Sequence, residues 1–167
     1  MKYIEVVAFS KLGEAVERET GFRTRIELYT CKRTKKERKT IVEIKRKKKY
    51  QDPHWNTRES RERTNLLCDL ICTLNVAYPD YDFTQKETGD FTNIKAEDAI
   101  GAVERNVFFK QRDVSGVFWE ELDREIDMRR CDVFSFEEIA PSESRWSANY
   151  LFYNKKRKRV VAVIVER

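Results

Sequence analysis

Residues 146–167, WSANYLFYNKKRKRVVAVIVER, decide the fold of this chain. Side chains of an extended chain alternate between two faces, and both faces of residues 146–153 carry large apolar or aromatic groups. After a turn at Asn154 and Lys155, residues 160–165 are apolar on both faces, which is typical of a central strand covered on both sides. The segment therefore predicts a hairpin within a sheet that has helices on at least one face.

Other stretches with a period of two surround this hairpin. Residues 25–31 and 40–45 alternate, and we expect them to form a second hairpin joined by a very basic loop at 32–39. Residues 3–7 and 131–136 are also strand-like, and residues 141–145 are expected to form a turn. These local connections predict several neighbouring antiparallel strands.

Helical spacing is clearest in residues 59–78, where apolar side chains recur at i, i+3, i+4, i+7 and i+11. Further helices are expected at 10–18, capped by Ser10, at 96–112, and from Gly116 onward. Strands and helices do not alternate as in a doubly wound sheet. We therefore predict an α+β fold with a central, mostly antiparallel sheet of about five strands flanked by helices.

The length and composition favour a single domain over residues 1–167, since 167 residues with 40% hydrophobic side chains can bury one core. The net charge of +5 is unevenly distributed. The stretch from Lys32 to Lys49 is strongly basic, and a basic loop or linker is expected at about 46–60. Such a surface attracts nucleic acid, acidic protein faces or anionic lipid.

The sequence shows no signal peptide and no stretch long and apolar enough to span a membrane, so we expect a soluble intracellular protein with no membrane partner. Its four cysteines are then expected to be reduced thiols. Cys68 and Cys72 lie four residues apart without further metal-ligand partners, which favours buried thiols over zinc. Because no phosphate loop, nucleophile with histidine or complete metal set is present, we expect no enzyme, cofactor or metal.

Residues 79–84, PDYDFT, follow the 59–78 helix, which Pro79 ends. Asp80 and Asp82 flank Tyr81, and paired carboxylates can carry out acid–base chemistry or bind a cation. Their spacing matches only a fragment of a calcium loop. Helix capping and turn formation are therefore the favoured uses of these two residues.

The same residues carry a resemblance to a known family. PDYDFT, followed at a distance by WSANYLFYNKKRKRVV, resembles two signature boxes of the Maf-one family, the eukaryotic repressors of RNA polymerase III transcription. RIELYTCK at 25–32 resembles that family's first box. LICTLN at 70–75, FWEELDREI at 118–126 and CDVFSF at 131–136 resemble its intervening pattern, so the resemblance covers nearly the whole chain.

The resemblance implies a monomeric, non-enzymatic regulator that shuttles between nucleus and cytoplasm. Family members bind the clamp region of RNA polymerase III and prevent assembly with the TFIIIB initiation factor, which reduces synthesis of tRNA and 5S RNA when nutrients fail. The signature residues that could contact a partner are Asp80, Tyr81, Asp82, Phe83, Trp146, Asn149, Tyr150, Tyr153 and Asn154. For the aromatic residues Trp146, Tyr150 and Phe152, packing in the core is the favoured interpretation.

Family members are also controlled by phosphorylation in a mobile Ser-rich insertion, which is reduced here to the basic segment ending near Asn65. Thr34, Thr40 and Thr64 lie beside basic residues and are the phosphorylation candidates. The run KKRKR is a candidate for nuclear import, although a tight hairpin could simply display its charge to solvent. Its residues are Lys155, Lys156, Arg157, Lys158 and Arg159.

A second class of function stays open beside the polymerase-binding repressor. The stretch from Lys32 to Lys49 could bind nucleic acid, with Tyr29, Tyr50 and Trp55 as stacking groups. Binding of that kind weakens steeply with salt because counterions are released. Co-purification of polymerase subunits that survives nuclease treatment would instead favour the repressor.

Overall fold

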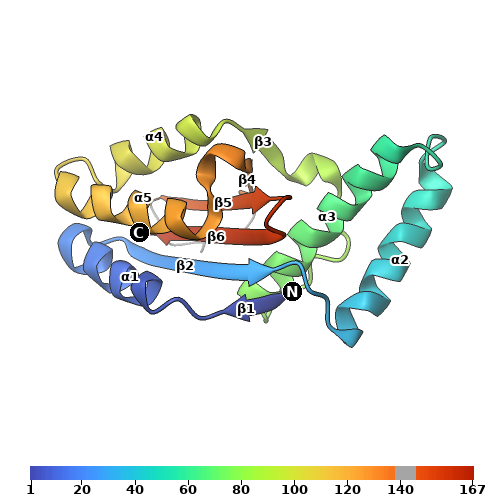
Figure 1. Ribbon diagram of the computed structural model, residues 1–167, viewed down its shortest axis with the longest axis horizontal. Helices are drawn as coiled ribbons and strands as arrows, with labels where there is room; N and C mark the ends of the chain where they lie inside the picture. Colours follow the sequence, from blue (N-terminus) through green and yellow to red (C-terminus); the bar gives the residue numbers. More distant parts are fainter. Residues whose placement is uncertain (138–145) are drawn as a thin grey trace.

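The computed structural model describes residues 1–137 and 146–167, and the turn expected at 141–145 lies outside these residues (Figure 1). The described chain forms one six-stranded antiparallel sheet in the order β1-β2-β6-β5-β4-β3. The strands are β1 (Lys2–Ile4), β2 (Arg23–Thr30), β3 (Thr92–Ile94), β4 (Asp132–Ser135), β5 (Ser147–Asn154) and β6 (Arg159–Glu166). The predicted α+β class is confirmed, with one strand more than expected.

The terminal hairpin lies at the centre of the sheet, as predicted. β6 pairs with β5 from Asn154↔Arg159 to Ser147↔Glu166, and with β2 along its other edge over the same length. Every residue of 160–165 is buried. Side chains of β6 therefore contribute alternately to a hydrophobic core on each face of the sheet.

Five helices surround the described sheet, together with two short 3₁₀ turns, η1 (Thr88–Asp90) and η2 (Met128–Arg130). The helices are α1 (Val7–Thr20), α2 (Lys35–Gln51), α3 (Arg58–Ala77), α4 (Ala96–Asn106) and α5 (Arg112–Ile126). Apolar side chains of α2 and α3 belong to the core on one face of the sheet, and those of α1, α4 and α5 to the core on the other. This three-layer arrangement explains why β6 is apolar on both faces.

The second hairpin, expected from a loop at 32–39 and a strand at 40–45, is wrong, because this region forms α2. Thr34 caps the helix by accepting a hydrogen bond from the Glu37 backbone, and the Glu37 side chain accepts one from the Thr34 backbone. Ile41 and Ile44, three residues apart, are buried, whereas Val42 is 65% exposed. The capping box and the helical spacing of the buried residues favour a helix more strongly than the short alternation favours a strand. The loop expected at 46–60 is reduced to residues 52–57, between α2 and α3.

The boundaries of three other helices also differ from expectation. α1 begins at Val7, so Ser10 lies inside the helix and does not cap it. The single helix expected at 96–112 ends at Asn106, and α5 begins before Gly116. The break folds the chain back so that the rings of Phe108 and Phe118 meet edge to face at 5.2 Å between centroids. Burying both rings stabilises the fold more than continuing the helix would.

Candidate functional site

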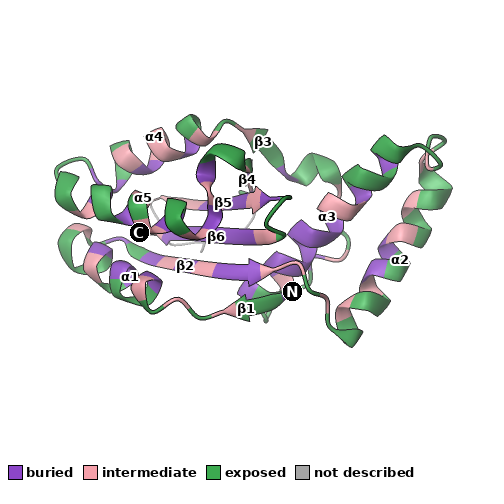
Figure 2. Cartoon of the chain, viewed as in Figure 1, coloured by how far each residue is buried: buried purple, intermediate pink, exposed green. Residues whose placement is uncertain are grey.

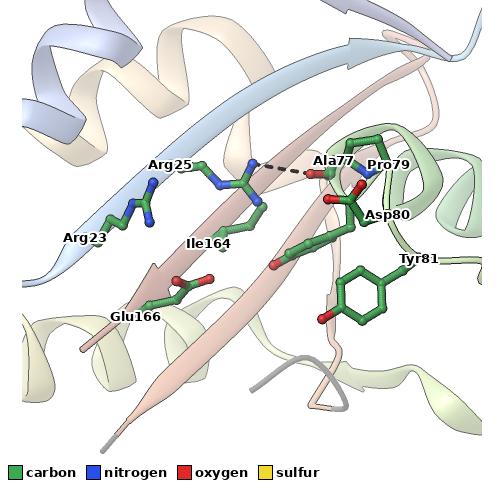
Figure 3. Close-up of a pocket in the computed structure, with 9 residues that line it drawn as sticks. Arg23, Arg25, Ala77, Pro79, Asp80, Tyr81, Ile164 and Glu166 are labelled. Atoms are coloured by element: carbon green, nitrogen blue, oxygen red, sulfur yellow. Dashed lines mark hydrogen bonds between the residues drawn. The ribbon is translucent and has the colours of Figure 1, made fainter. Parts of the chain in front are cut away.

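A groove of about 330 Å³ opens where the loop after α3 crosses the ends of β2 and β6 (Figure 3). It combines residues from three separate parts of the sequence. The lining residues are Arg23, Arg25, Ala77, Tyr78, Pro79, Asp80, Tyr81, Ile164 and Glu166. The groove therefore includes the loop of the PDYDFT motif and the last strand of the terminal hairpin.

The loop over the groove is fixed to α3 by backbone hydrogen bonds. The Phe83 amide donates to the side-chain oxygen of Asn75 at 2.9 Å, and the Tyr81 amide donates to the Tyr78 carbonyl at 3.1 Å. Asp82 accepts from the Thr84 amide at 2.9 Å, which is the turn-forming use favoured from the sequence. The loop thus has a defined shape on the end of a long helix.

Aromatic rings determine which parts of the loop are buried. Phe83 is 4% exposed and meets Phe136 edge to face, with 5.7 Å between ring centroids. Tyr81 stacks on Phe83 at 6.1 Å, yet 58% of Tyr81 remains exposed. Phe83 therefore anchors the loop in the core, while Tyr81 is held rigidly at the surface.

Tyr78 connects the two signature stretches. Its hydroxyl donates to the side-chain oxygen of Asn149 on β5, and Asn149 is 4% exposed. Burial raises the pKa of Tyr78 to about 12, so the phenol stays protonated and acts as a donor at neutral pH. Asn149 consequently positions the loop from inside the molecule and is not accessible to a partner.

The groove carries charges of both signs beside its aromatic residues. The Arg25 guanidinium donates to the Ala77 carbonyl at 3.3 Å and lies 5.1 Å from the centroid of the Tyr78 ring (Figure 3). Arg23 and Glu166 are cross-strand neighbours, and Asp80 is exposed on the loop. Tyrosine and arginine are among the residue types that contribute most to binding energy at protein interfaces. The groove therefore has the chemistry of a protein-binding surface.

Four other predicted site residues lie away from the groove. Trp146 meets Phe22 edge to face at 5.7 Å, and Trp146 and Tyr150 pack on the core of α1, α4 and α5. The Tyr153 hydroxyl donates to Asp69 at 3.3 Å. Asn154 is fully buried and donates to the Ile126 carbonyl at 2.7 Å. These residues hold the sheet to its helices, so the structure does not gather all the signature residues in one site.

The basic residues of the β5–β6 turn are partly engaged in contacts with α3 and α5. Lys155 donates to Glu62 at 3.0 Å, Arg157 donates to the Glu125 carbonyl at 3.0 Å, and Arg159 donates to the Glu125 carboxylate at 3.2 Å. Lys156 and Lys158 are exposed. The turn therefore displays its charge as a compact patch and not as an extended peptide.

The phosphorylation candidates differ in accessibility. Thr34 is exposed at the start of α2, and Thr40 is half-buried within that helix. Thr64 is only 5% exposed, and its hydroxyl donates to the Ser60 carbonyl at 3.0 Å. The accessibility that a kinase requires is therefore absent at Thr64 in the folded chain.

Two further predictions, for the cysteine pair and for Tyr29, have opposite outcomes. Cys68 and Cys72 are buried as expected, and burial raises the pKa of each thiol to about 11. Across residues 1–137 and 146–167, no group of three His, Cys, Asp or Glu side chains could hold a metal ion. Tyr29, expected to stack on nucleic acid, is instead 1% exposed and donates to Glu27 at 2.6 Å.

Sequence reasoning missed Arg23, Arg25, Tyr78 and Glu166 as groove residues. The alternation of residues 25–31 predicts only a strand that includes Arg25, and the apolar spacing of residues 59–78 predicts only a helix that ends at Tyr78. The one available signal was the position of Tyr78 directly before Pro79, where a helix must end and a side chain can turn toward the sheet. Pairing of β2 with β6 could not be inferred locally.

No helix in the described part of the chain is long and apolar enough to cross a membrane. The family model described as Maf1 regulator matches residues 22–164 of this chain. This match includes β2, the loop over the groove and most of the terminal hairpin. It therefore covers every residue that lines the groove except Glu166.

Two curated relatives extend over nearly the whole chain. A Schizosaccharomyces pombe protein named repressor of RNA polymerase III transcription maf1 is 24% identical over 193 residues, covering 96% of this chain and 80% of that protein. An uncharacterized Encephalitozoon cuniculi protein is 25% identical over 173 residues, covering 96% of this chain and 94% of its own length.

The fold also matches a solved structure. A crystal structure of citrus MAF1 superposes with a TM-score of 0.74 at 23% identity, covering 95% of this chain and 97% of the citrus chain. At this identity the match establishes the fold alone. The shared architecture is the antiparallel sheet with helices on both faces.

Proposed function

The chain belongs to the Maf1 regulator family, and on this premise we propose that it represses transcription by RNA polymerase III. It would do so by binding the polymerase in its clamp region and blocking assembly with TFIIIB at promoters during stress or starvation. The names of the matched relatives support the general role. The proposed action is steric and non-enzymatic, so it requires a rigid, complementary surface.

The observation that carries this proposal is the anchored loop over the groove. Tyr81 is 58% exposed between two exposed carboxylates, while Phe83 beside it is buried. An exposed side chain that is already held in place loses little conformational entropy on binding. Acidic groups around it favour a basic partner surface and reject an acidic one. We therefore assign polymerase contact to the Asp80–Tyr81–Asp82 segment and the groove below it.

The proposal predicts that Tyr81→Ala weakens polymerase binding strongly. A central interface tyrosine contributes about 2 kcal/mol or more, which corresponds to a roughly 30-fold loss of affinity. Titration of the purified variant against purified RNA polymerase III measures the affinity, and a tRNA-gene transcription assay measures repression. Asp80→Lys, which reverses an exposed charge, should reduce binding in the same assay.

Phe109→Ala is the matched control, because Phe109 is an exposed aromatic residue, 76% accessible, in the connection between α4 and α5. Loss of the stacking contact between Tyr81 and Phe83 costs on the order of 1 kcal/mol, so thermal melting must show that Tyr81→Ala remains folded. If the folded Tyr81→Ala and Asp80→Lys proteins repress transcription fully, the groove is not the surface that contacts the polymerase.

We further propose that the protein shuttles between nucleus and cytoplasm and that the β5–β6 turn supports import. The support is the exposure of four consecutive basic residues, 155–158, on one turn. Replacing Lys155, Lys156 and Lys158 by Gln in the full chain should reduce nuclear fluorescence of a tagged protein. The control replaces the exposed residues Lys11, Lys95 and Lys110 by Gln instead. Equal nuclear accumulation of both variants would contradict import through this turn.

A further inference from the structure

α2 holds more positive charge than the chain as a whole. Its 17 residues include nine basic and two acidic side chains, whereas the whole chain has a net charge of +5. The remaining residues therefore carry a net charge of −2. Figure 1 shows α2 beside α3 at one end of the molecule, so this charge is concentrated at that end.

The charges of α2 also follow one line on its outer face. Positions 35, 39, 42, 46 and 49 have the spacing i, i+4, i+7, i+11 and i+14, which places them on a single stripe. All five are exposed, as the exposed colour along α2 in Figure 2 illustrates. Lys35, Lys39, Arg46 and Lys49 supply four cations along about 21 Å of helix, with Val42 between them.

Contacts on the opposite side hold α2 in position. Ile41 and Ile44 are 4% and 6% exposed and belong to the same core cluster as the apolar residues of α3. Lys47 and Lys48 both pair with Glu87, which fixes the C-terminal end of the helix. The four cations of the stripe, Lys35, Lys39, Arg46 and Lys49, make no ion pair with any acidic residue among residues 1–137 and 146–167. The stripe is thus a fixed row of four cations that form no ion pair within the described residues, with exposed Glu43 beside it.

We propose that the outer face of α2 binds the phosphate backbone of duplex DNA. The major groove of B-DNA accommodates an α-helix, and the duplex offers about one negative charge per 1.7 Å along its axis. Four cations on one side of a helix of this length can therefore each approach a phosphate. Such contacts to phosphates do not depend on the base sequence of the DNA. Dependence on base sequence would require side chains that contact the edges of the bases.

Other anionic partners fit the stripe less well. A membrane-surface helix needs a large apolar face, and the apolar residues Ile41 and Ile44 of α2 already face the core. A protein interface has a core depleted in lysine, whereas lysine predominates on this stripe. Single-stranded nucleic acid is bound by stacking on several aromatic rings, and Tyr50 is the one aromatic residue in α2.

Fluorescence anisotropy with a labelled 20-base-pair DNA duplex of arbitrary sequence and the full chain tests the proposal. Four phosphate contacts predict a slope of about −3.6 in a plot of log affinity against log salt concentration. Affinity should therefore fall roughly 150-fold between 50 and 200 mM salt. The variant K35Q/K39Q/R46Q/K49Q should lose this binding, and Gln preserves helix propensity at each position.

The control variant K11Q/R129Q/K156Q/K158Q removes four exposed cations from other elements and has the same net charge. It should retain both the affinity and the salt slope of the unmodified chain, and circular dichroism should show native melting for both variants. Equal loss in the two variants would overturn the proposal, since net charge alone would then explain binding. Equal or tighter binding to single-stranded DNA, polyglutamate or anionic vesicles would also overturn it.

Discussion

Tyr78 joins parts of the chain that lie 71 residues apart, because its buried hydroxyl donates to Asn149. Tyr78→Phe removes this donor and retains the ring that packs against Arg25 and Phe83. Loss of a buried hydrogen bond costs about 1–3 kcal/mol. We expect the urea midpoint of unfolding to fall accordingly, with an unchanged slope.

Tyr81→Phe provides the comparison for this prediction. Tyr81 is more than half exposed, so removal of its hydroxyl should change the free energy of unfolding by less than about 0.5 kcal/mol. A Tyr78→Phe protein as stable as the Tyr81→Phe protein would show that the bond to Asn149 does not hold the loop.

For individual side chains, the sequence predicts burial better than it predicts hydrogen-bond partners. Phe152 is buried in the core as expected, and Trp146 and Tyr150 are half-buried and pack against it, because strand alternation distributes aromatic residues between two faces. The roles of Asn149 and Asn154 could not be predicted. A buried amide finds its partners on elements that are distant in the sequence, and nothing local specifies which elements those are.

At the scale of elements, α3 and the terminal hairpin were predicted closely because each has a long and regular apolar pattern. α2 was predicted wrongly because its apolar pattern consists of only three residues, Ile41, Val42 and Ile44, which fit both a short strand and a helical face. The Thr34 and Glu37 capping box was the signal that distinguishes these alternatives. The groove required pairing of β2 with β6, which is a long-range feature that no local pattern specifies.

For the whole molecule, the buried cysteine thiols and the buried tyrosine phenol predict a loss of stability at alkaline pH. Folding raises the pKa of Cys68 and Cys72 to about 11 from 9.0, and that of Tyr78 to about 12 from 10.0. Above pH 9 the unfolded chain loses protons that the folded chain retains, so the free energy of unfolding falls as pH rises. The decline should extend from about pH 9 to 12.

Urea midpoints measured with a reducing agent at pH 8, 10 and 11 check this dependence. A Cys68→Ala/Cys72→Ala protein should be less stable at pH 8, because the substitutions leave cavities, but should depend less on pH between 9 and 11. A midpoint for the unmodified chain that stays constant from pH 8 to 11 would contradict the prediction.

The position of β6 between β2 and β5 has a consequence for the time course of folding. The pairs Thr30↔Arg159 and Arg23↔Glu166 join residues that lie 129 and 143 positions apart in the sequence. Such distant pairing slows folding, because a long loop must close before the contacts can stabilise it. During synthesis, β2 (Arg23–Thr30) is made well before β6 (Arg159–Glu166), so the edge of β2 that pairs with β6 stays unpaired until β6 has emerged. During that interval the nascent chain would depend on chaperones to prevent the edge of β2 from pairing with other chains.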